Sequence, residues 1–371
     1  MGSVREIARR ASVSIATVSR VLNDGAGVGE ETRQRVLAEV NASGYVRRVG
    51  LRTVAEGIAL AYAGPGTVAS PFDQALLAGI GRTVADAEAG EDFGNDLLIV
   101  NLKRSLRPGE SPSALFARKG IKGVILRTTD EGLPLCRQLA DEGFPSVVAG
   151  SRLSEGDAGA NLSWVDGASR ETSRDAVRHL VRLGHRRIGV IVNYRQDTDH
   201  RDRVDGWRDA LVEAGLPADP GAADDPFPRV LRERATYEHG AALAHRWKAA
   251  PTRSRPTAVY VADPMPALGL LRGACECGVS VPGDLSVIGF DDGNTRRLTF
   301  PPMAAVCQDA AAIGEAAVDL LRVRIAAGVR QRDDRPAAPP PPERRSIPTT
   351  YEPGATVGPP PPRSHFTSET T

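Results

Sequence analysis

Apolar residues recur at helical spacing at the start of the chain. Residues 4–23 predict two short helices joined by a tight turn at Val13, with Ser14 placed to cap the second helix. The facing apolar positions are Ile7, Ala8 and Ala11 in the first helix and Ile15, Val18, Val21 and Leu22 in the second. A third helix is predicted over 30–42, where Val36, Leu37 and Val40 would pack on the first two. This arrangement is typical of a helix-turn-helix, although an ordinary helical hairpin with a solvated polar face shares the pattern.

From residue 54 onward the pattern changes to short β-rich runs that alternate with amphipathic helical stretches. The predicted strands are Ile58–Tyr62, Leu97–Leu102, Gly123–Arg127, Ser146–Ala149, Ile188–Val192, Ala258–Val261 and Ser286–Phe290. Helices are predicted over Pro71–Ala89, Gly167–Leu183, Val204–Ala214 and Glu233–Lys248. This alternation favours an α/β fold, with parallel sheets covered on both faces. About seven such units suit two doubly wound subdomains, with ligands bound between them at the carboxyl ends of the strands.

The composition excludes several classes of protein. The 371 residues carry a net charge of +1 and suggest about two or three domains. The first 50 residues carry eight arginines against five acidic residues, which suits contact with phosphates. No apolar run approaches the roughly 18 residues of a membrane span and no signal peptide is visible, so we expect a cytoplasmic protein without membrane partners. Because Cys136, Cys275, Cys277 and Cys307 lack the spacing of a zinc site, we predict no metal and no cofactor.

The helix-turn-helix stretch and its continuation resemble the lactose/galactose-repressor (LacI/GalR) family of bacterial transcription regulators. The shared positions are Ala11, Val13, Ser14, 17–23, Thr32, Arg33, Val36, Gly44 and Tyr45. The resemblance implies DNA contacts by Ser14, Ile15, Ala16, Thr17, Ser19, Arg20, Asn23 and Arg33. Base reading is implied for Ile15, Ala16 and Arg20, and phosphate contact for Thr17, Ser19 and Asn23. Arg20 can bond guanine O6 and N7 together, whereas Ile15 and Ala16 offer apolar contact to a thymine methyl group.

Two features depart from the family pattern. Ser12 replaces the family's turn glycine, and a serine in a left-handed conformation costs about 1 kcal/mol. The family's hinge helix carries an A-R-x-L motif whose leucine enters the minor groove, and residues 47–54 contain no such motif. Leu51, beside Arg52, is the candidate that remains for this wedge. A shortened hinge predicts weaker operator binding, or weaker coupling of operator binding to the effector.

The resemblance continues through most of the chain, in residues 70–80, 179–191, 203–211 and 278–292. It implies a periplasmic-binding-protein-like domain in which three segments of chain cross between two doubly wound parallel-sheet subdomains. The predicted domains are a headpiece over 1–46, a linker over 47–54, a first subdomain over 55–184 and 307–327, and a second subdomain over 185–305 and 346–357. The proline-rich segments 328–345 and 358–371 are predicted to be an extended loop and tail.

The resemblance also nominates contacts to a small ligand in the cleft between the subdomains. The nominated residues are Phe72, Asp166, Arg203, Trp207, Asp263 and Asp291, joined by Arg104 and Arg127 because these two follow strand ends. A surface salt bridge is the alternative for Arg104 and Arg127. Ala262 stands where the family has a ligand-binding asparagine, so a well-known family sugar cannot be assumed. The extra arginines would suit an acidic or phosphorylated sugar, since a guanidinium fork matches carboxylates and phosphates.

We therefore predict a DNA-binding transcription regulator, a repressor, that binds a pseudo-palindromic operator as a homodimer formed through its first subdomain. A small sugar-like effector would close the cleft and change the spacing of the headpieces. One alternative is a regulator of the same lineage that has lost its ligand response and acts constitutively. A different class of alternative is a sugar-binding or sugar-processing protein. Against an enzyme, the sequence shows no nucleophile–base pair, and His185 is interpreted as structural.

Overall fold

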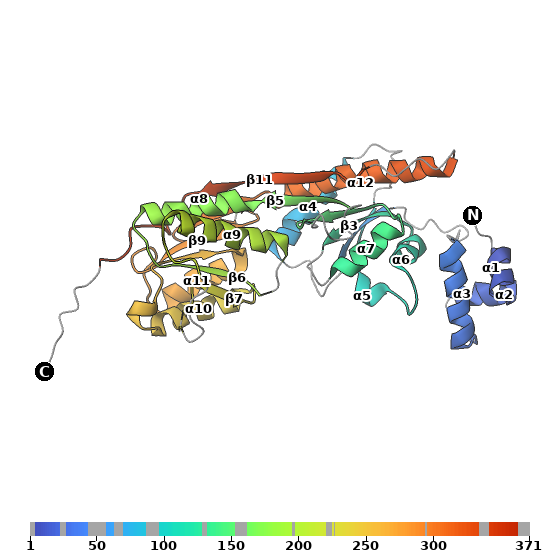
Figure 1. The fold of residues 1–371 in the computed structure, drawn as a ribbon, viewed down its shortest axis with the longest axis horizontal. Coiled ribbons are helices and arrows are strands. Elements are labelled where there is room, and N and C mark those ends of the chain that lie inside the picture. The colour runs from blue at the N-terminus through green and yellow to red at the C-terminus, as the bar shows by residue number, and fades with distance from the viewer. Residues whose placement is uncertain are drawn as a thin grey trace.

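A computed structural model describes residues 4–22, 27–43, 57–62, 70–86, 96–127, 132–152, 162–194, 197–219, 225, 227–293, 295–333 and 341–362. It comprises an N-terminal bundle of three helices and a larger α/β domain (Figure 1). The predicted linker over 47–54 lies outside the described residues, and so does the predicted DNA contact Asn23.

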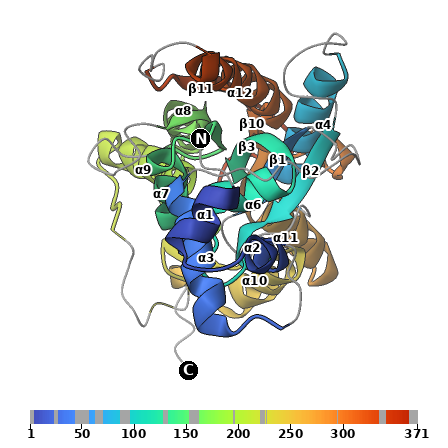
Figure 2. The same ribbon diagram turned by 90° about the vertical axis from the view of Figure 1, so that its right-hand side faces the viewer.

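The N-terminal bundle is formed by α1 (Val4–Arg10), α2 (Ile15–Leu22) and α3 (Glu30–Ser43), which Figure 2 shows gathered together. Its core contains the predicted apolar positions Ile7, Ala8, Ala11, Val18, Val21, Val36 and Val40. Ile15 is the exception, because its side chain is 51% exposed and does not join the core. The helical spacing of the sequence is therefore enough to define this bundle, apart from Ile15.

The turn between α1 and α2 has the predicted cap and the predicted left-handed residue. The backbone N–H of Thr17 donates to Oγ of Ser14 over 3.0 Å, which satisfies one of the free amide groups at the start of α2. Ser12 has φ = 54°, where glycine is normally favoured. The chain thus makes the tight helix-turn-helix connection with serine in place of glycine.

The first half of the α/β domain contains a parallel sheet in the order β2-β1-β3-β4-β5. Its strands are β1 (Gly57–Tyr62), β2 (Asp96–Asn101), β3 (Ile121–Arg127), β4 (Ser146–Ala149) and β5 (Ser163–Ala168). Helices α4 (Pro71–Ala85) and α12 (Ala310–Asp333) cover one face. The other face packs on α5 (Leu102–Ser105), α6 (Pro112–Arg118) and α7 (Leu133–Asp141). Because both faces are covered, the inner strands β1, β3 and β4 are mostly buried and apolar.

The second half repeats this order of strands as β7-β6-β8-β9-β10. Its strands are β6 (Ile188–Asn193), β7 (Val230–Glu233), β8 (Ala258–Val261), β9 (Ser286–Asp291) and β10 (Ala304–Gln308). Helices α8 (Ser169–Arg182) and α9 (Thr198–Glu213) cover one face, and α10 (Tyr237–Ala249) and α11 (Pro264–Glu276) cover the other (Figure 1). Two short 3-10 turns, Thr252–Ser254 and Thr295–Leu298, complete this half.

Strand β11 (Arg344–Glu352) joins the halves into one eleven-stranded sheet. It runs parallel to β5 of the first half and antiparallel to β10 of the second half. The chain also crosses between the halves after β5 and after β10, since α8 packs in the second half and α12 in the first. The α/β fold of two doubly wound parallel sheets is therefore as predicted, with three crossing segments.

The structure corrects several predicted boundaries. The helix predicted from Gly167 begins at Ser169, because residues 163–168 pair with β4 and β11 as strand β5. Helix α8 packs in the second half, so the predicted limit of the first subdomain at residue 184 is too late. Helix α12 continues to Asp333, into the segment predicted as loop from residue 328. The family resemblance implied a final strand near Ser346–Thr356 in the second subdomain, and the observed strand runs from Arg344 to Glu352. Strands β7 and β10 and helix α11 were not predicted.

No helix within the described ranges combines the length and the apolar content needed to cross a membrane. The same part of the chain holds no cluster of three or more His, Cys, Asp or Glu side chains arranged for a metal ion.

Candidate functional site

A cavity of about 160 Å³ lies where the carboxyl ends of the two sheets face each other. In each half, the order of the strands reverses at one point, between β1 and β3 in the first sheet and between β6 and β8 in the second. Doubly wound α/β proteins bind ligands at such switch points. The first half contributes Ser70, Pro71, Phe72, Arg127 and Gly150 to the lining. The second half contributes Asn193, Asp197, Asp199, His200, Arg203, Ala235, Asp263, Pro264, Met265 and Asp292. The loops that follow the strands thus meet in one polar cavity.

Arg203 reaches the cavity from α9 and is only 4% exposed. Its guanidinium forms an ion pair with Asp199, one helical turn earlier, and Nη1 donates to the carbonyl of Ala262 over 2.6 Å. The group also stacks on the ring of Phe290, 3.5 Å from the ring centroid. Nε is buried and has no hydrogen-bond partner among the described residues. Arg203 is therefore held firmly but retains one unused donor.

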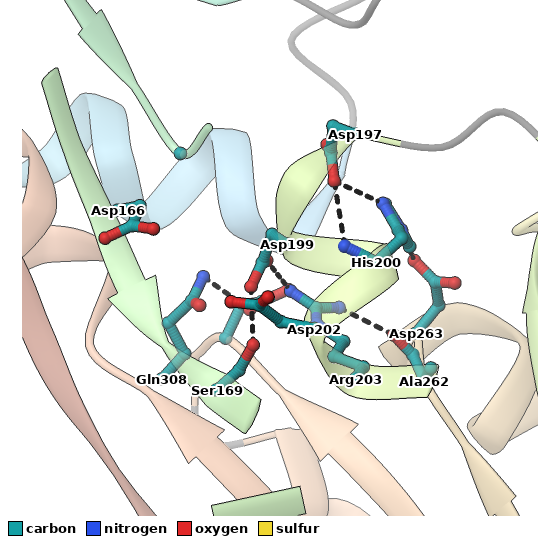
Figure 3. Close-up of polar contacts among 12 residues, drawn as sticks. Asp166, Ser169, Asp197, Asp199, His200, Asp202, Arg203, Ala262, Asp263 and Gln308 are labelled. Carbon is teal, nitrogen blue, oxygen red and sulfur yellow. Dashed lines mark hydrogen bonds and ion pairs between the residues drawn. The ribbon is translucent and has the colours of Figure 1, made fainter. Parts of the chain in front are cut away.

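His200 lies between two carboxylates (Figure 3). Nδ1 donates to Asp197 over 2.7 Å and Nε2 donates to Asp263 over 3.0 Å. Burial lowers the pKa of His200, but the charges of Asp197 and Asp263 outweigh burial and raise it well above its usual value. The backbone N–H of His200 also donates to Asp197, which caps α9. The hydrogen bonds of His200 to Asp197 and Asp263 thus connect the start of α9 to the residue that follows β8.

Arg127, the last residue of β3, is fixed on the opposite wall of the cavity. Its Nε donates to Asp73 over 3.2 Å, its Nη1 donates to the carbonyl of Ala149 over 2.9 Å, and its guanidinium stacks on Phe72 at 4.3 Å. Gly150 has φ = 74°, and a Cβ there would lie 2.5 Å from Nη1 of Arg127. Glycine is required at 150 both by the backbone conformation and by the close approach of this arginine.

Asp292 follows β9 and faces the cavity with only 5% of its surface exposed. Nε2 of Gln308 donates to its Oδ1 over 3.4 Å. Burial raises the pKa of Asp292 to about 7, although the nearby charge of Arg203 opposes this effect. The carboxylate is thus desolvated without a close ion pair within the described residues, and it titrates near neutral pH.

Four of the residues predicted for the cleft line this cavity: Phe72, Arg127, Arg203 and Asp263. Asp166 is buried beside the cavity at the crossing strands, where Oγ of Ser346 donates to it over 2.7 Å. Burial raises the pKa of Asp166 to about 6. Arg104 lies on α5 with its side chain exposed, away from the lining.

Trp207 and Asp291 also lie outside the cavity lining. Trp207 is fully buried in the core of the second half, and its Nε1 donates to the carbonyl of Ile188 over 3.2 Å. Asp291 accepts hydrogen bonds from the backbone N–H groups of Gly293, Thr295 and Arg296, so it fixes the loop after β9. Its neighbour Asp292 takes the place in the cavity that the sequence interpretation gave to Asp291.

The sequence interpretation also missed Asp197, Asp199 and His200. Their signal lies in the register of α9: Asp199 precedes Arg203 by four residues, and Asp197 precedes His200 by three. Side chains at these spacings share one helix face, so a buried arginine in α9 predicts a buried acid one turn before it.

Most residues predicted to contact DNA lie on or near α2. Ser14, Ile15, Ala16, Ser19 and Arg20 are exposed, whereas Thr17 is partly buried and its Oγ1 lies 2.8 Å from Oγ of Ser14. Arg33 is partly buried near the start of α3. The exposed side chains therefore form a continuous polar and apolar face on α2, opposite its buried residues Val18 and Val21.

A helix-turn-helix bundle combined with a two-sheet domain and an internal polar cavity defines a class: transcription regulators with a periplasmic-binding-protein-like domain. Residues 3–48 match the family described as "Bacterial regulatory proteins, lacI family", and residues 177–357 match the "Periplasmic binding protein-like domain". The chain belongs to the LacI family of bacterial transcription regulators.

Relatives span most of the chain. An HTH-type transcriptional regulator in the aml 5' region of Streptomyces limosus is 32% identical over 336 residues, covering 89% of this chain and 90% of the relative. The HTH-type transcriptional regulator MalR of Streptomyces coelicolor is 30% identical over 326 residues, covering 85% of this chain and 88% of the relative.

Solved structures share the fold. The transcriptional regulator CelR in complex with cellobiose superposes with a TM-score of 0.64 at 25% identity, covering 96% of this chain and all of the other. The lac repressor dimer bound to operator and the anti-inducer ONPF has a TM-score of 0.60 at 21% identity, covering 96% of this chain and 99% of the other.

Proposed function

We propose that this regulator is a repressor that binds a pseudo-palindromic operator as a homodimer and is controlled by a small sugar or sugar derivative in the cavity. The observation that carries this proposal is the cavity itself, in which buried polar groups from both halves converge on one space between them. Its structural relatives include a regulator in complex with cellobiose and a repressor dimer on its operator. We place its action in the cytoplasm, where operator DNA is found, and we propose no enzymatic activity.

The DNA-binding role rests on the exposed face of α2. A second helix of this kind enters the major groove with its N-terminal side chains on base edges. Arg20 supplies a guanidinium for guanine, and Ile15, half exposed despite being apolar, supplies a contact surface for a thymine methyl group. Two such helices on a two-fold axis require two half-sites of opposite orientation.

Dimer formation is supported by apolar side chains on the surface of the α/β domain. Leu298 and Phe300, in the loop between β9 and β10, are 86% and 100% exposed. In the first half, where the interface is predicted, Ile99 and Val323 are also more than half exposed. Ile99 and Val323 are therefore the candidates for burial in the predicted interface of the first half.

Control by the ligand follows from the position of the cavity between the halves. A ligand that contacts lining residues of both halves, such as Phe72 and Arg203, favours one relative orientation of the halves, and the first halves carry the headpieces. The coupling between effector and operator is reciprocal: whatever lowers operator affinity must itself bind less tightly in the presence of operator. A ligand with equal affinity for both orientations would change nothing.

The test is selection of bound sites from random duplex DNA by the purified full-length protein near physiological salt. We expect a two-fold symmetric consensus, which then serves as a probe for release by sugars. Binding that depends on salt but not on sequence would overturn the regulator proposal. A symmetric site that no small molecule releases would leave DNA recognition intact and would favour the constitutive alternative.

A further inference from the structure

The cations that line the cavity are already engaged by carboxylates. Arg203 pairs with Asp199, Arg127 pairs with Asp73, and His200 is shared by Asp197 and Asp263. An acidic or phosphorylated ligand would have to compete with these buried acids for each cation. Because a buried charge is stable only when it is paired, displacing the acids would be costly. The arginines therefore do not favour an anionic ligand, although the sequence suggested one.

Asp292 is the carboxylate of the cavity lining that forms no ion pair among the described residues. Its only hydrogen bond among the described residues is the long one from the neutral amide of Gln308, and no described cation forms an ion pair with it. The nearest guanidinium, that of Arg203, is directed to Asp199 and Ala262. A carboxylate that is 95% buried beside an open cavity calls for a cation that enters the cavity from outside.

A second unused group lies on the same wall. Nε of Arg203 is buried and has no acceptor among the described residues. A buried donor without a partner costs free energy that an acceptor on a ligand would recover. The residues that line the cavity thus include one carboxylate without an ion pair and one arginine with an unpaired donor. The cavity volume of about 160 Å³ is below the range of roughly 300–1,000 Å³ typical of drug-sized ligands, and suits a single sugar ring.

We propose that the effector of this cavity is an amino sugar, whose ammonium group pairs with Asp292 and whose hydroxyl oxygen accepts from Nε of Arg203. This inference rests on the proposed function, because it names the ligand of the same cavity. The remaining hydroxyl groups donate to the carboxylates of Asp199 and Asp263. The cavity lining contains more hydrogen-bond acceptors than free donors, so it favours a ligand rich in donors, such as an amino sugar.

The ionisation of Asp292 gives the proposal a second signature. Burial raises the pKa of this carboxyl to about 7, so that a large fraction is protonated just below neutral pH. An ammonium group binds the ionised form. Affinity should therefore increase as the pH rises through about 7, until the amine of the ligand begins to lose its own proton, and binding near pH 6 should release protons to the buffer.

The experiment is isothermal titration calorimetry of the full-length protein with glucosamine, galactosamine and mannosamine, each compared with its parent hexose. Glucose 6-phosphate serves as the anionic probe. We expect at least one amino sugar to bind more tightly than its parent hexose by about tenfold or more, which corresponds to one charged contact. Tighter binding of a neutral hexose or of glucose 6-phosphate would overturn the inference, and so would the absence of binding by every amino sugar.

Asp292→Asn is the matched variant, since it keeps the shape and removes the charge. We expect it to abolish the preference for the amine and the increase of affinity with pH. Asp209→Asn is the control, because Asp209 pairs with Arg170 on the surface of the second half, away from the cavity. An unchanged preference in Asp292→Asn, with thermal stability retained, would exclude Asp292 as the partner of the amine.

The outcomes separate this inference from the proposed function. Release of the operator by neutral sugars with no response to amines would retain ligand control and reject the amino sugar. Failure of all the sugars to bind, with a symmetric operator still recognised, would reject the amino sugar and favour the constitutive alternative.

Discussion

Nη2 of Arg152 donates a 2.5 Å hydrogen bond to Oδ2 of Asp202, and this ion pair joins the two halves of the α/β domain. Arg152 follows β4 in the first half, and Asp202 lies on α9 in the second half. The backbone N–H of Arg152 also donates to Oγ1 of Thr198 over 2.7 Å. These contacts form a direct connection between the halves that is separate from the crossing strands.

Removing this connection should loosen the halves. We expect a double-mutant cycle of Arg152→Ala and Asp202→Asn, measured by urea unfolding, to give a coupling energy of about 1 kcal/mol. The value is modest because one third of the Arg152 side chain is exposed to water. The control pair is Arg170 and Asp209, which lies wholly within the second half. An Arg152→Ala variant that is no more sensitive to proteolysis than the wild type would show that the pair has no role in holding the halves together.

Replacing Arg203 should destabilise the second half strongly. Arg203→Met leaves the carboxylate of Asp199 buried without its ion-pair partner, which costs roughly 3–5 kcal/mol of unfolding free energy. The double variant Arg203→Met with Asp199→Asn should recover part of this loss, because no unpaired charge remains. Chemical denaturation of the wild type and of both variants measures both effects. Equal stability of the single and double variants would contradict this account of Asp199.

The contribution of Asp292 to the free energy of unfolding should fall as the pH rises from about 5 to 7, whereas His179 and His185, whose pKa values burial lowers, act in the opposite direction. The pKa of Asp292 is raised from 3.8 to about 7, so in this interval the folded protein holds a proton that the unfolded chain has released. Unfolding then releases protons, and the free energy of unfolding decreases with increasing pH. Asp166, whose pKa is raised to about 6, acts in the same direction.

The variant Asp292→Asn should show a shallower decrease over the same interval, whereas Asp209→Asn should keep the wild-type slope. Thermal unfolding in a series of buffers of equal ionic strength provides the measurement. An identical slope in Asp292→Asn and in the wild type would show that Asp292 does not titrate in this range.

Arg20→Ala should weaken specific DNA binding by about 1–3 kcal/mol and leave binding to random DNA nearly unchanged. The reason is that a bidentate contact to guanine is lost, while the phosphate contacts remain. Binding to a selected operator and to a scrambled duplex is compared by fluorescence anisotropy. Arg178→Ala, which removes an exposed arginine from α8, controls for the change in net charge. Equal losses on both duplexes would assign Arg20 to phosphate contact.

The helix-turn-helix could be predicted almost completely because its contacts are local. Ile7, Val18 and Val36 meet within a segment of about forty residues, and the helical spacing decides which side of each helix is buried. Ser14 caps α2 through an amide three residues away. The prediction that Ile15 is buried was wrong, because Ile15 is the first residue of α2 and its side chain remains exposed.

Strands without a clear apolar pattern depend on distant partners. β5 was missed because it includes Asp166 and Gly167, whose polarity and flexibility are untypical of a central strand; it is stabilised by pairing with β4 and β11. β11 was predicted only through the family resemblance, since it alternates between exposed and partly buried residues and pairs with strands that lie far from it in sequence. Pairing of this kind leaves no local signal.

By itself, the sequence determined the headpiece, the α/β alternation and the family, because these depend on spacing along the chain and on contiguous motifs. It also nominated Phe72, Arg127, Arg203 and Asp263, which lie in the cavity lining. Only the tertiary structure decided that Asp292 rather than Asp291 faces the cavity, and that His200 is shared by Asp197 and Asp263. These relationships join loops from separate strands, and the burial that changes their ionisation exists only once both halves have folded together.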